Sequence, residues 1–593
     1  MRHSQFILTW GPGAILEGPE GPRIVPMPEI GLFYKKHIKP EDFEISDSRM
    51  SKGLLNNRRI FRLPSNAELN IDENYPVYMT KMFPEWSICV THGILFLRRY
   101  GCPKCKRERK RGKWDAIRFV QACPEGHLDD VDWDYIVHYR SHGRCPSPTS
   151  PSKRYYIWKG GGGSLRNIRI ECPRCGAAVN FGDMYRRDWP CSGRFPEREP
   201  LNFPPQRKGC SSSAKIILRQ ASNLRIPEIV SLFTIPPRYT RLHNLLEMPA
   251  IKSALVTHKI SSMEELQSIL LSLKNNGLIK AGTMVEILSH PWEEIRDAIK
   301  DVLSSSYELG YANLILEEYH ALINASIYGV PPVRGPPPTS EVWFEVVKDK
   351  VRQVSGPSGR IFRVVPITRL RTVIVQKGYR RMDPNGKLIE VWFRDRNGEE
   401  WYPGVEFLGE GIFIMLDKNE GYHPQVASDS WEEWHRCHAT HKDTSTVYQH
   451  MIFRDPSKKE ELHPVFVWWH TLSHLLLRVL AIDSGYSSAS IRERVYFEMS
   501  EKGVRGGVVL YTVQPGEGTM GGLLSLANHF EKILRRAIEI AETCPNDPLC
   551  IEQAFKCGAV TGSACYGCLL VSETSCEHRN MWLDRHVLLE DCP

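Results

Sequence analysis

Cysteine spacing constrains this chain more than any other feature. Of seventeen cysteines in 593 residues, eight lie between Cys102 and Cys210 and seven between Cys544 and Cys592. The N-terminus lacks the long apolar run of a signal peptide, so we expect a cytoplasmic, reducing environment in which thiols bind metals more often than they form disulfides. Cys89 and Cys437 stand apart, and we expect both to pack as small hydrophobic residues.

Three CxxC pairs are accompanied by further ligands at the spacing of structural zinc sites, which take four Cys or His ligands. The first set is Cys102, Cys105, Cys123 and His127, with Cys145 as the competing fourth ligand; the second is Cys172, Cys175, Cys191 and Cys210; the third is Cys565, Cys568 and Cys576, preceded by Cys544 and Cys550. The pattern predicts about three structural Zn²⁺ sites.

Two other kinds of site are alternatives. A redox CxxC pair needs only two thiols, whereas each pair here has further cysteines nearby. A catalytic zinc site needs an open coordination position, and HTLSH does place His470 and His474 four residues apart. That motif lacks the glutamate of HExxH, so we expect the two histidines to be packed or hydrogen-bonded. A zinc-dependent nuclease or hydrolase remains the alternative function.

A dense basic run follows the first CxxC cysteine. Seven of the ten residues in KCKRERKRGK are basic: Lys104, Lys106, Arg107, Arg109, Lys110, Arg111 and Lys113. Such a run is often only a solvated loop, but it also suits phosphate contacts, because neutralised phosphates release counterions. It could equally meet an acidic protein surface. The net charge of +8 permits a nucleic-acid partner without demonstrating one.

Composition and periodicity predict a soluble multidomain chain of mixed α+β and α/β type, with zinc-ribbon-like modules, a helical middle segment and a C-terminal α/β domain that ends in a four-cysteine zinc site. We predict a mostly β domain at 1–95, two zinc modules at 96–215, a helical region at 216–329, a β-rich region at 330–440 after a proline-rich linker, and an α/β zinc domain at 441–593. The apolar stretch at 466–482 contains two histidines and an arginine, so it predicts a buried helix and no membrane span.

Two motifs resemble known sites and fail on context. GEGTMG at 516–521 matches GxGxxG, but no second strand ending in an acidic residue follows it. HIK at 37–39 resembles the start of a phospholipase-D-type motif, but Glu44 stands where aspartate belongs. The sequence also has no GxxxxGK[ST], which disfavours nucleotide hydrolysis by P-loop chemistry.

The stretch SACYGCLLVSETSCEHRNMWLDR at 563–585 resembles the end of the MrfA-like zinc-binding domain, which is known as an appendage of DNA helicases. Further motifs in the same order resemble the DrmB family, the helicase-partner subunits of the DISARM phage-defence system. These are SQFILTWGPGAIL, RFVQACPEGHLDDVDW, EYHAL, GEGIF, GTMGGL and CPNDPLC.

This resemblance implies a non-catalytic subunit that binds a DrmA-type helicase as a heterodimer and helps it to engage foreign DNA. It also implies one zinc site made by Cys565, Cys568, Cys576 and either Cys550 or Cys544. We favour Cys550 because it lies nearer the CxxC pair. A purely structural bridging subunit is the other alternative.

Overall fold

The computed structural model describes the chain except for residues 1–2, 33–37, 140–144, 146–152, 161–162, 202–203, 237–240, 247, 259, 304–309, 333–341, 384–385, 419–420, 441–461, 487, 501, 514–520 and 558. Most of the predicted proline-rich linker and of the GEGTMG motif lies outside the described residues.

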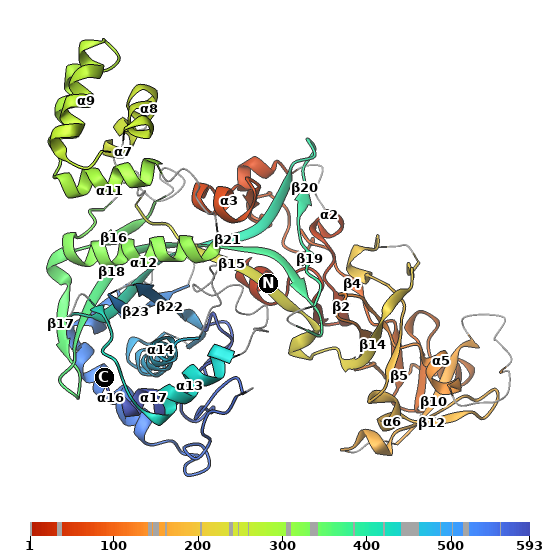
Figure 1. The fold of residues 1–593 in the computed structure, drawn as a ribbon. Coiled ribbons are helices and arrows are strands. Elements are labelled where there is room, and N and C mark those ends of the chain that lie inside the picture. Colours follow the sequence, from red (N-terminus) through yellow and green to blue (C-terminus); the bar gives the residue numbers. More distant parts are fainter. Residues whose placement is uncertain are drawn as a thin grey trace.

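A ten-stranded sheet forms the centre of the molecule (Figure 1). Its main path is antiparallel and runs β15 (Ile226–Phe233), β18 (Ile361–Arg380), β21 (Glu400–Leu416), β23 (Gly503–Thr512) and β22 (Ile491–Ser500). Five short strands pair with β18 or β21: β16 (Phe344–Val346), β17 (Arg352–Ser355), β19 (Ile389–Glu390), β20 (Phe393–Arg394) and β3 (Arg59–Phe61).

Helices cover both faces of this sheet. Figure 1 shows α12 (Tyr311–Tyr328) on one side of β22 and β23 and α14 (Pro464–Ser484) on the other. The alternation of strand side chains explains the arrangement, because Val495 and Phe497 pack in the core around α14 while Tyr496 packs in the core around α12. α14 is long and apolar enough to cross a membrane, but 83% of its most apolar window is buried. It is the central core helix of its face.

The C-terminal lobe consists of the helices around α14 and the cysteine-rich residues 543–584. Its helices are α13 (Asp429–Thr440), α14, α15 (Gly522–Leu526), α16 (Phe530–Glu542) and α17 (Arg585–Glu590). One hydrophobic core joins α14, α16, α17 and the loop that contains Cys550 and Cys568. The lobe therefore surrounds α14 and packs against the central sheet.

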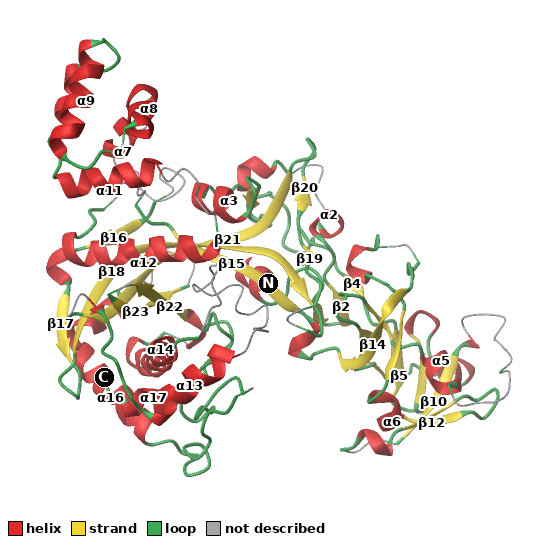
Figure 2. Ribbon diagram, in the orientation of Figure 1, coloured by secondary structure: helices red, strands yellow, loops and turns green. Residues whose placement is uncertain are grey.

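The residues from 86 to 218 form a separate arm that is mostly strands and loops (Figure 2). A six-stranded sheet runs β12 (Ala178–Asn180), β11 (Arg169–Glu171), β10 (Tyr155–Lys159), β6 (Ile94–Leu97), β5 (Trp86–Cys89) and β7 (Trp114–Ala116). A four-stranded sheet runs β13 (Asp188–Cys191), β14 (Cys210–Leu218), β8 (Phe119–Ala122) and β9 (Leu128–Asp130). The arm also holds the short helices α4 (Pro103–Arg107), α5 (Trp133–His138) and α6 (Phe181–Tyr185).

The remaining elements form two further groups. The N-terminal group contains α1 (His3–Leu8), β1 (Ile15–Gly18), β2 (Gly21–Ile24), α2 (Pro28–Gly31), α3 (Ser48–Leu54) and β4 (Lys81–Met82). A helical cluster with its own apolar core contains α7 (Arg241–Leu246), α8 (Pro249–Thr257), α9 (Met263–Asn275), α10 (Ala281–Leu288) and α11 (Trp292–Leu303). It projects away from the sheet in Figure 1.

A mixed α/β multidomain architecture with several cysteine clusters is confirmed, including a four-cysteine group near the C-terminus. The predicted domain boundaries and the zinc-ribbon character of the modules stay predictions. The central sheet takes β15 from the region predicted as helical and β22 and β23 from the predicted C-terminal domain. Strand pairing between distant segments produces this mixing, and hydrophobic periodicity within a window does not report it.

Candidate metal centres

The first cluster joins Cys89 and His92, at the turn between β5 and β6, to Cys102 and Cys105 at the start of α4. Cys105 Sγ lies 3.6 Å from Cys89 Sγ and 3.2 Å from His92 Nδ1. Tetrahedral zinc with Zn–S bonds of about 2.3 Å places its sulfur ligands about 3.8 Å apart. The other ring nitrogen, His92 Nε2, lies 3.2 Å from a carboxylate oxygen of Glu108, a partner that orients a metal-binding imidazole.

The second cluster joins Cys123 and His127, in the turn between β8 and β9, to Cys191 and Cys210. Strand pairing builds it, since Cys191 faces Cys210 in the β13–β14 register and β14 also pairs with β8. Cys123 Sγ lies 3.5 Å from Cys191 Sγ and 3.3 Å from His127 Nδ1.

The third cluster joins Cys172 and Cys175, after β11, to His138 of α5 and to Cys145. Cys145 Sγ lies 3.7 Å from Cys172 Sγ. His138 Nδ1 lies 2.6 Å from the carbonyl oxygen of Asp134. A carbonyl only accepts hydrogen bonds, so Nδ1 carries the proton and Nε2 is the nitrogen that would bind a metal.

The fourth cluster contains cysteines only and lies in the C-terminal lobe. Cys544 Sγ is 3.4 Å from Cys565 Sγ, Cys550 Sγ is 3.8 Å from Cys568 Sγ, and the two sulfurs of the CxxC pair, or knuckle, formed by Cys565 and Cys568 are 3.7 Å apart. Both candidate cysteines of the CPNDPLC loop therefore join the group. The choice between Cys544 and Cys550 does not arise.

All twelve predicted metal ligands lie in groups that could hold a metal ion, but the predicted four-ligand sets differ from the groups that the structure forms. Cys123 and His127 lie with Cys191 and Cys210 instead of with Cys102 and Cys105. Cys172 and Cys175 take His138 and Cys145 instead of Cys191 and Cys210, and Cys576 lies apart from the knuckle cysteines, next to His470. The reason is that β8 pairs with β14, whereas the first knuckle follows the β5–β6 hairpin of another sheet.

Sequence reasoning missed Cys89, His92 and His138 as cluster members. The pair in CVTH, at residues 89–92, carries a local signal, because Cys and His three residues apart resemble half of a zinc site. His138 has no such signal. It reaches its cluster only because α5 packs beside β12.

Each of the four clusters contains a thiol whose pKa is lowered, namely Cys89, Cys123, Cys175 and Cys565, which favours the thiolate form that binds metals. The hydrogen bond with Cys191 is the largest influence on Cys123 and helps to lower its pKa to about 5. Burial raises the pKa of Cys565, but hydrogen bonds led by that from Asn546 outweigh burial and lower the pKa to about 6.

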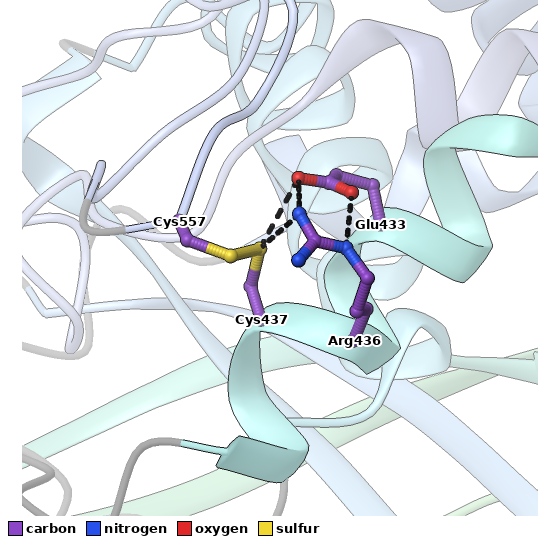
Figure 3. Close-up of a disulfide and its surroundings, with 4 residues drawn as sticks. All are labelled: Glu433, Arg436, Cys437 and Cys557. Atoms are coloured by element: carbon purple, nitrogen blue, oxygen red, sulfur yellow. Dashed lines mark hydrogen bonds and ion pairs between the residues drawn. A yellow bond between two sulfur atoms is a disulfide. The ribbon is translucent and has the colours of Figure 1, made fainter.

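Cys437 of α13 forms a disulfide with Cys557, 120 residues further along the chain (Figure 3). Figure 3 also shows Arg436 paired with Glu433 beside it, with Arg436 Nη2 2.6 Å from Glu433 Oε1. Cys437 is therefore not a packed free thiol as the sequence predicted. Cys89, the other cysteine predicted to be one, lies in the first cluster.

The predicted basic run lies on the surface beside the first cluster. All seven basic side chains between residues 104 and 113 are exposed, and Lys110 pairs with Glu108 at 3.2 Å. The run begins in α4, where Cys102 and Cys105 anchor its first turn. Trp114 follows, 37% exposed, with the Arg98 guanidinium 4.1 Å from its ring centroid.

Two family models match the chain. Residues 472–569 match the MrfA Zn-binding domain and residues 2–226 match a domain of unknown function, DUF8724. The match to the MrfA Zn-binding domain runs from α14 to just past Cys568. It contains all four cysteines of the fourth cluster, whereas Cys576 lies beyond it. These matches and the four cysteine-rich clusters suggest a zinc-binding protein that contains an MrfA-type domain.

The "DISARM protein DrmB" of Bacillus paralicheniformis is 27% identical to this chain over 504 residues, which are 82% of each chain. The chain is thus DrmB-like over most of its length and carries an MrfA-like C-terminal domain, as the resemblance indicated. A solved structure of the DUF1998 helicase MrfA bound to DNA shares 11% identity at a TM-score of 0.19, covering 34% of this chain and 20% of that one. That likeness is too weak for any argument.

Proposed function

We propose that this chain is a non-catalytic DISARM subunit that binds a DrmA-type helicase and helps it to engage foreign DNA in the cytoplasm. The similarity to DrmB supports the place in a DISARM system. The observation that carries the DNA contact is the exposed basic run between residues 104 and 113, fixed at its base by the first cluster. A rigid cationic loop suits a phosphate backbone because it gives up little conformational freedom on binding.

In this proposal the first four clusters hold structural zinc, which gives four sites instead of the predicted three or so. Each cluster offers four Cys or His ligands, and closed four-ligand sites are typical of structural zinc. Three of these sites would brace the arm, whose sheets contain many strands of only three to five residues. Metal binding supplies folding free energy where such elements bury little apolar surface.

Charge reversal of the basic run tests the DNA contact. We expect the triple change Arg107→Glu, Arg109→Glu and Arg111→Glu to weaken DNA binding by the helicase complex at least tenfold. We also expect the slope of log affinity against log salt to become shallower, by about 0.9 for each duplex phosphate that the variant no longer neutralises. Fluorescence anisotropy with labelled DNA at several salt concentrations measures both quantities.

The matched control reverses Lys348, Lys350 and Arg352, which are also exposed but lie at the edge of the central sheet. This control should leave the affinity and the salt slope unchanged. Equal behaviour of the two triple variants would favour a subunit that only bridges proteins.

The hydrolase alternative depends on His470 and His474, and their position disfavours it. Both side chains are completely buried on α14, and so is Glu493 beside them. A catalytic metal needs a coordination position that substrate or water can reach. Metal-dependent cleavage of DNA that disappears in a His474→Gln variant would reverse this preference.

A further inference from the structure

The side chains of His470, His474, Glu493 and Cys576 meet at one point beneath the central sheet. The two histidines lie one turn apart on α14, Glu493 lies on β22, and Cys576 follows the third CxxC knuckle, eight residues after Cys568. All four side chains are at most 2% exposed. We call this group the His–Glu–Cys cluster.

The ligand atoms of this cluster are close together. His470 Nε2 lies 2.9 Å from Glu493 Oε1 and 3.3 Å from Cys576 Sγ. His474 Nε2 lies 3.2 Å from the same carboxylate oxygen. One atom from each of the four residues lies within 4.8 Å of every other, which is compatible with four ligands around one ion.

Backbone carbonyl groups fix which nitrogen of each histidine faces the cluster. His470 Nδ1 lies 3.2 Å from the carbonyl oxygen of Trp582, and His474 Nδ1 lies 2.9 Å from that of Leu569. A carbonyl only accepts, so each Nδ1 donates its proton, and Nε2 is the nitrogen that faces the cluster and can bind a cation there. This is the arrangement that second-shell partners impose on metal-binding histidines.

Cys576 and Glu493 also accept hydrogen bonds from donors outside the cluster. The backbone N–H groups of His578 and Asn580 both donate to Cys576 Sγ, at 3.3 Å each. The Ser473 hydroxyl donates to Glu493. Three acceptors face Cys576: the Nε2 atoms of the two histidines and the Glu493 carboxylate. The Cys576 thiol has one proton and can donate it to only one of them, so without a cation the buried acceptors would not all be satisfied.

We propose that the His–Glu–Cys cluster is a further metal site, separate from the four clusters described above, and that it binds one Zn²⁺ through two imidazoles, one carboxylate and one thiolate. This ligand set matches the nitrogen, oxygen and sulfur donors that zinc accepts. Four protein ligands in a fully buried position leave no place for substrate, so the ion is structural. It ties the C-terminal segment to the central helix and to the sheet, and it does not depend on the proposed DNA or helicase contact.

Metal analysis of the full-length chain tests this site. The purified chain, after dialysis against zinc-free buffer, should hold five zinc ions, one for each of the four clusters and one for this site. The variants His474→Gln and Cys576→Ser should each hold four, measured by native mass spectrometry and elemental analysis. Cys592→Ser is the matched control, because Cys592 is a free cysteine two residues after α17 and outside the metal groups described here, and this variant should still hold five.

Anomalous diffraction at the zinc edge tests the site in the unaltered protein, so it remains informative even when the variants fail to fold. A peak between His470 Nε2, His474 Nε2 and Cys576 Sγ is expected. A peak at the fourth cluster with none here would overturn the proposal, and so would an unchanged zinc content in both folded variants.

Discussion

Replacing Cys568 by serine should remove one zinc ion per chain and unfold the C-terminal lobe. Cys568 is fully buried, its sulfur lies between those of Cys550 and Cys565, and the next residue, Leu569, packs in the core around α14. Structural zinc in small domains has an apparent binding free energy of about 10–16 kcal/mol. That is as large as the whole stability of a typical domain, about 5–15 kcal/mol.

The measurement combines zinc content with limited proteolysis, in which cleavage within residues 543–584 should become fast. Tyr566→Ser provides the control, because Tyr566 lies between the two knuckle cysteines and its side chain is 84% exposed. This control should keep its zinc and its protease resistance. A Cys568→Ser protein with full zinc content and intact proteolytic resistance would contradict the assignment of the fourth cluster.

Replacing Arg194 by methionine should cost about 3 kcal/mol or more of unfolding free energy in the arm, as expected when one partner of a buried ion pair is removed. The Arg194 side chain is 1% exposed and donates to both oxygens of Glu199, at 2.9 and 3.0 Å, and to Asp129 at 2.7 Å. In the variant, the buried carboxylates of Glu199 and Asp129 lose one of the cations that balance their negative charge. Lys81 and Arg207 contact the same two carboxylates and offset part of the loss.

The cost of Arg194→Met should also depend on pH. Burial raises the pKa values of Asp129 and Glu199, but arginine hydrogen bonds outweigh burial and lower both below their ordinary values. Groups with lowered pKa values add stability at neutral pH, and that stability is lost as the pH falls through those values. The variant lacks part of this term, so its deficit should be largest at pH 7 and should shrink as the pH falls below the ordinary carboxyl pKa values, to a smaller deficit at about pH 3.

Denaturant unfolding at the two pH values measures this deficit. Arg186→Met is the control, because Arg186 is exposed at the end of α6, and it should change the unfolding free energy by less than about 0.5 kcal/mol. An Arg194→Met protein as stable as the control would show that the buried carboxylates do not need this cation.

The sequence predicts which residues could bind metal better than it predicts their partners. CPKC, CPRC and CYGC stand out because a knuckle is a local pattern. The partners come from chain segments that strand pairing brings together, as when β14 places Cys210 beside Cys123, 87 residues away. Spacing along the chain therefore suggests that neighbouring CxxC and Cys/His segments share one metal site. Strand pairing instead places these segments in different sheets and different clusters.

The HTLSH motif shows the same limit. Its histidines are buried and hydrogen-bonded, as the sequence predicts, but they also face a carboxylate. That carboxylate is Glu493, on a strand 19 residues beyond His474, and not a glutamate inside the helix. A search for HExxH finds only ligands on one helix, so it cannot find an acidic residue contributed by a neighbouring strand.

The central claim is that the chain helps a helicase to engage DNA, and a DNA-binding titration of a DrmA-type helicase with and without the chain tests this most directly. With the chain present, the helicase should co-purify as a heterodimer and bind DNA at least tenfold more tightly than alone. The increase should disappear with the Arg107→Glu, Arg109→Glu and Arg111→Glu variant. A chain that remains a monomer and leaves the DNA affinity of the helicase unchanged would contradict the account.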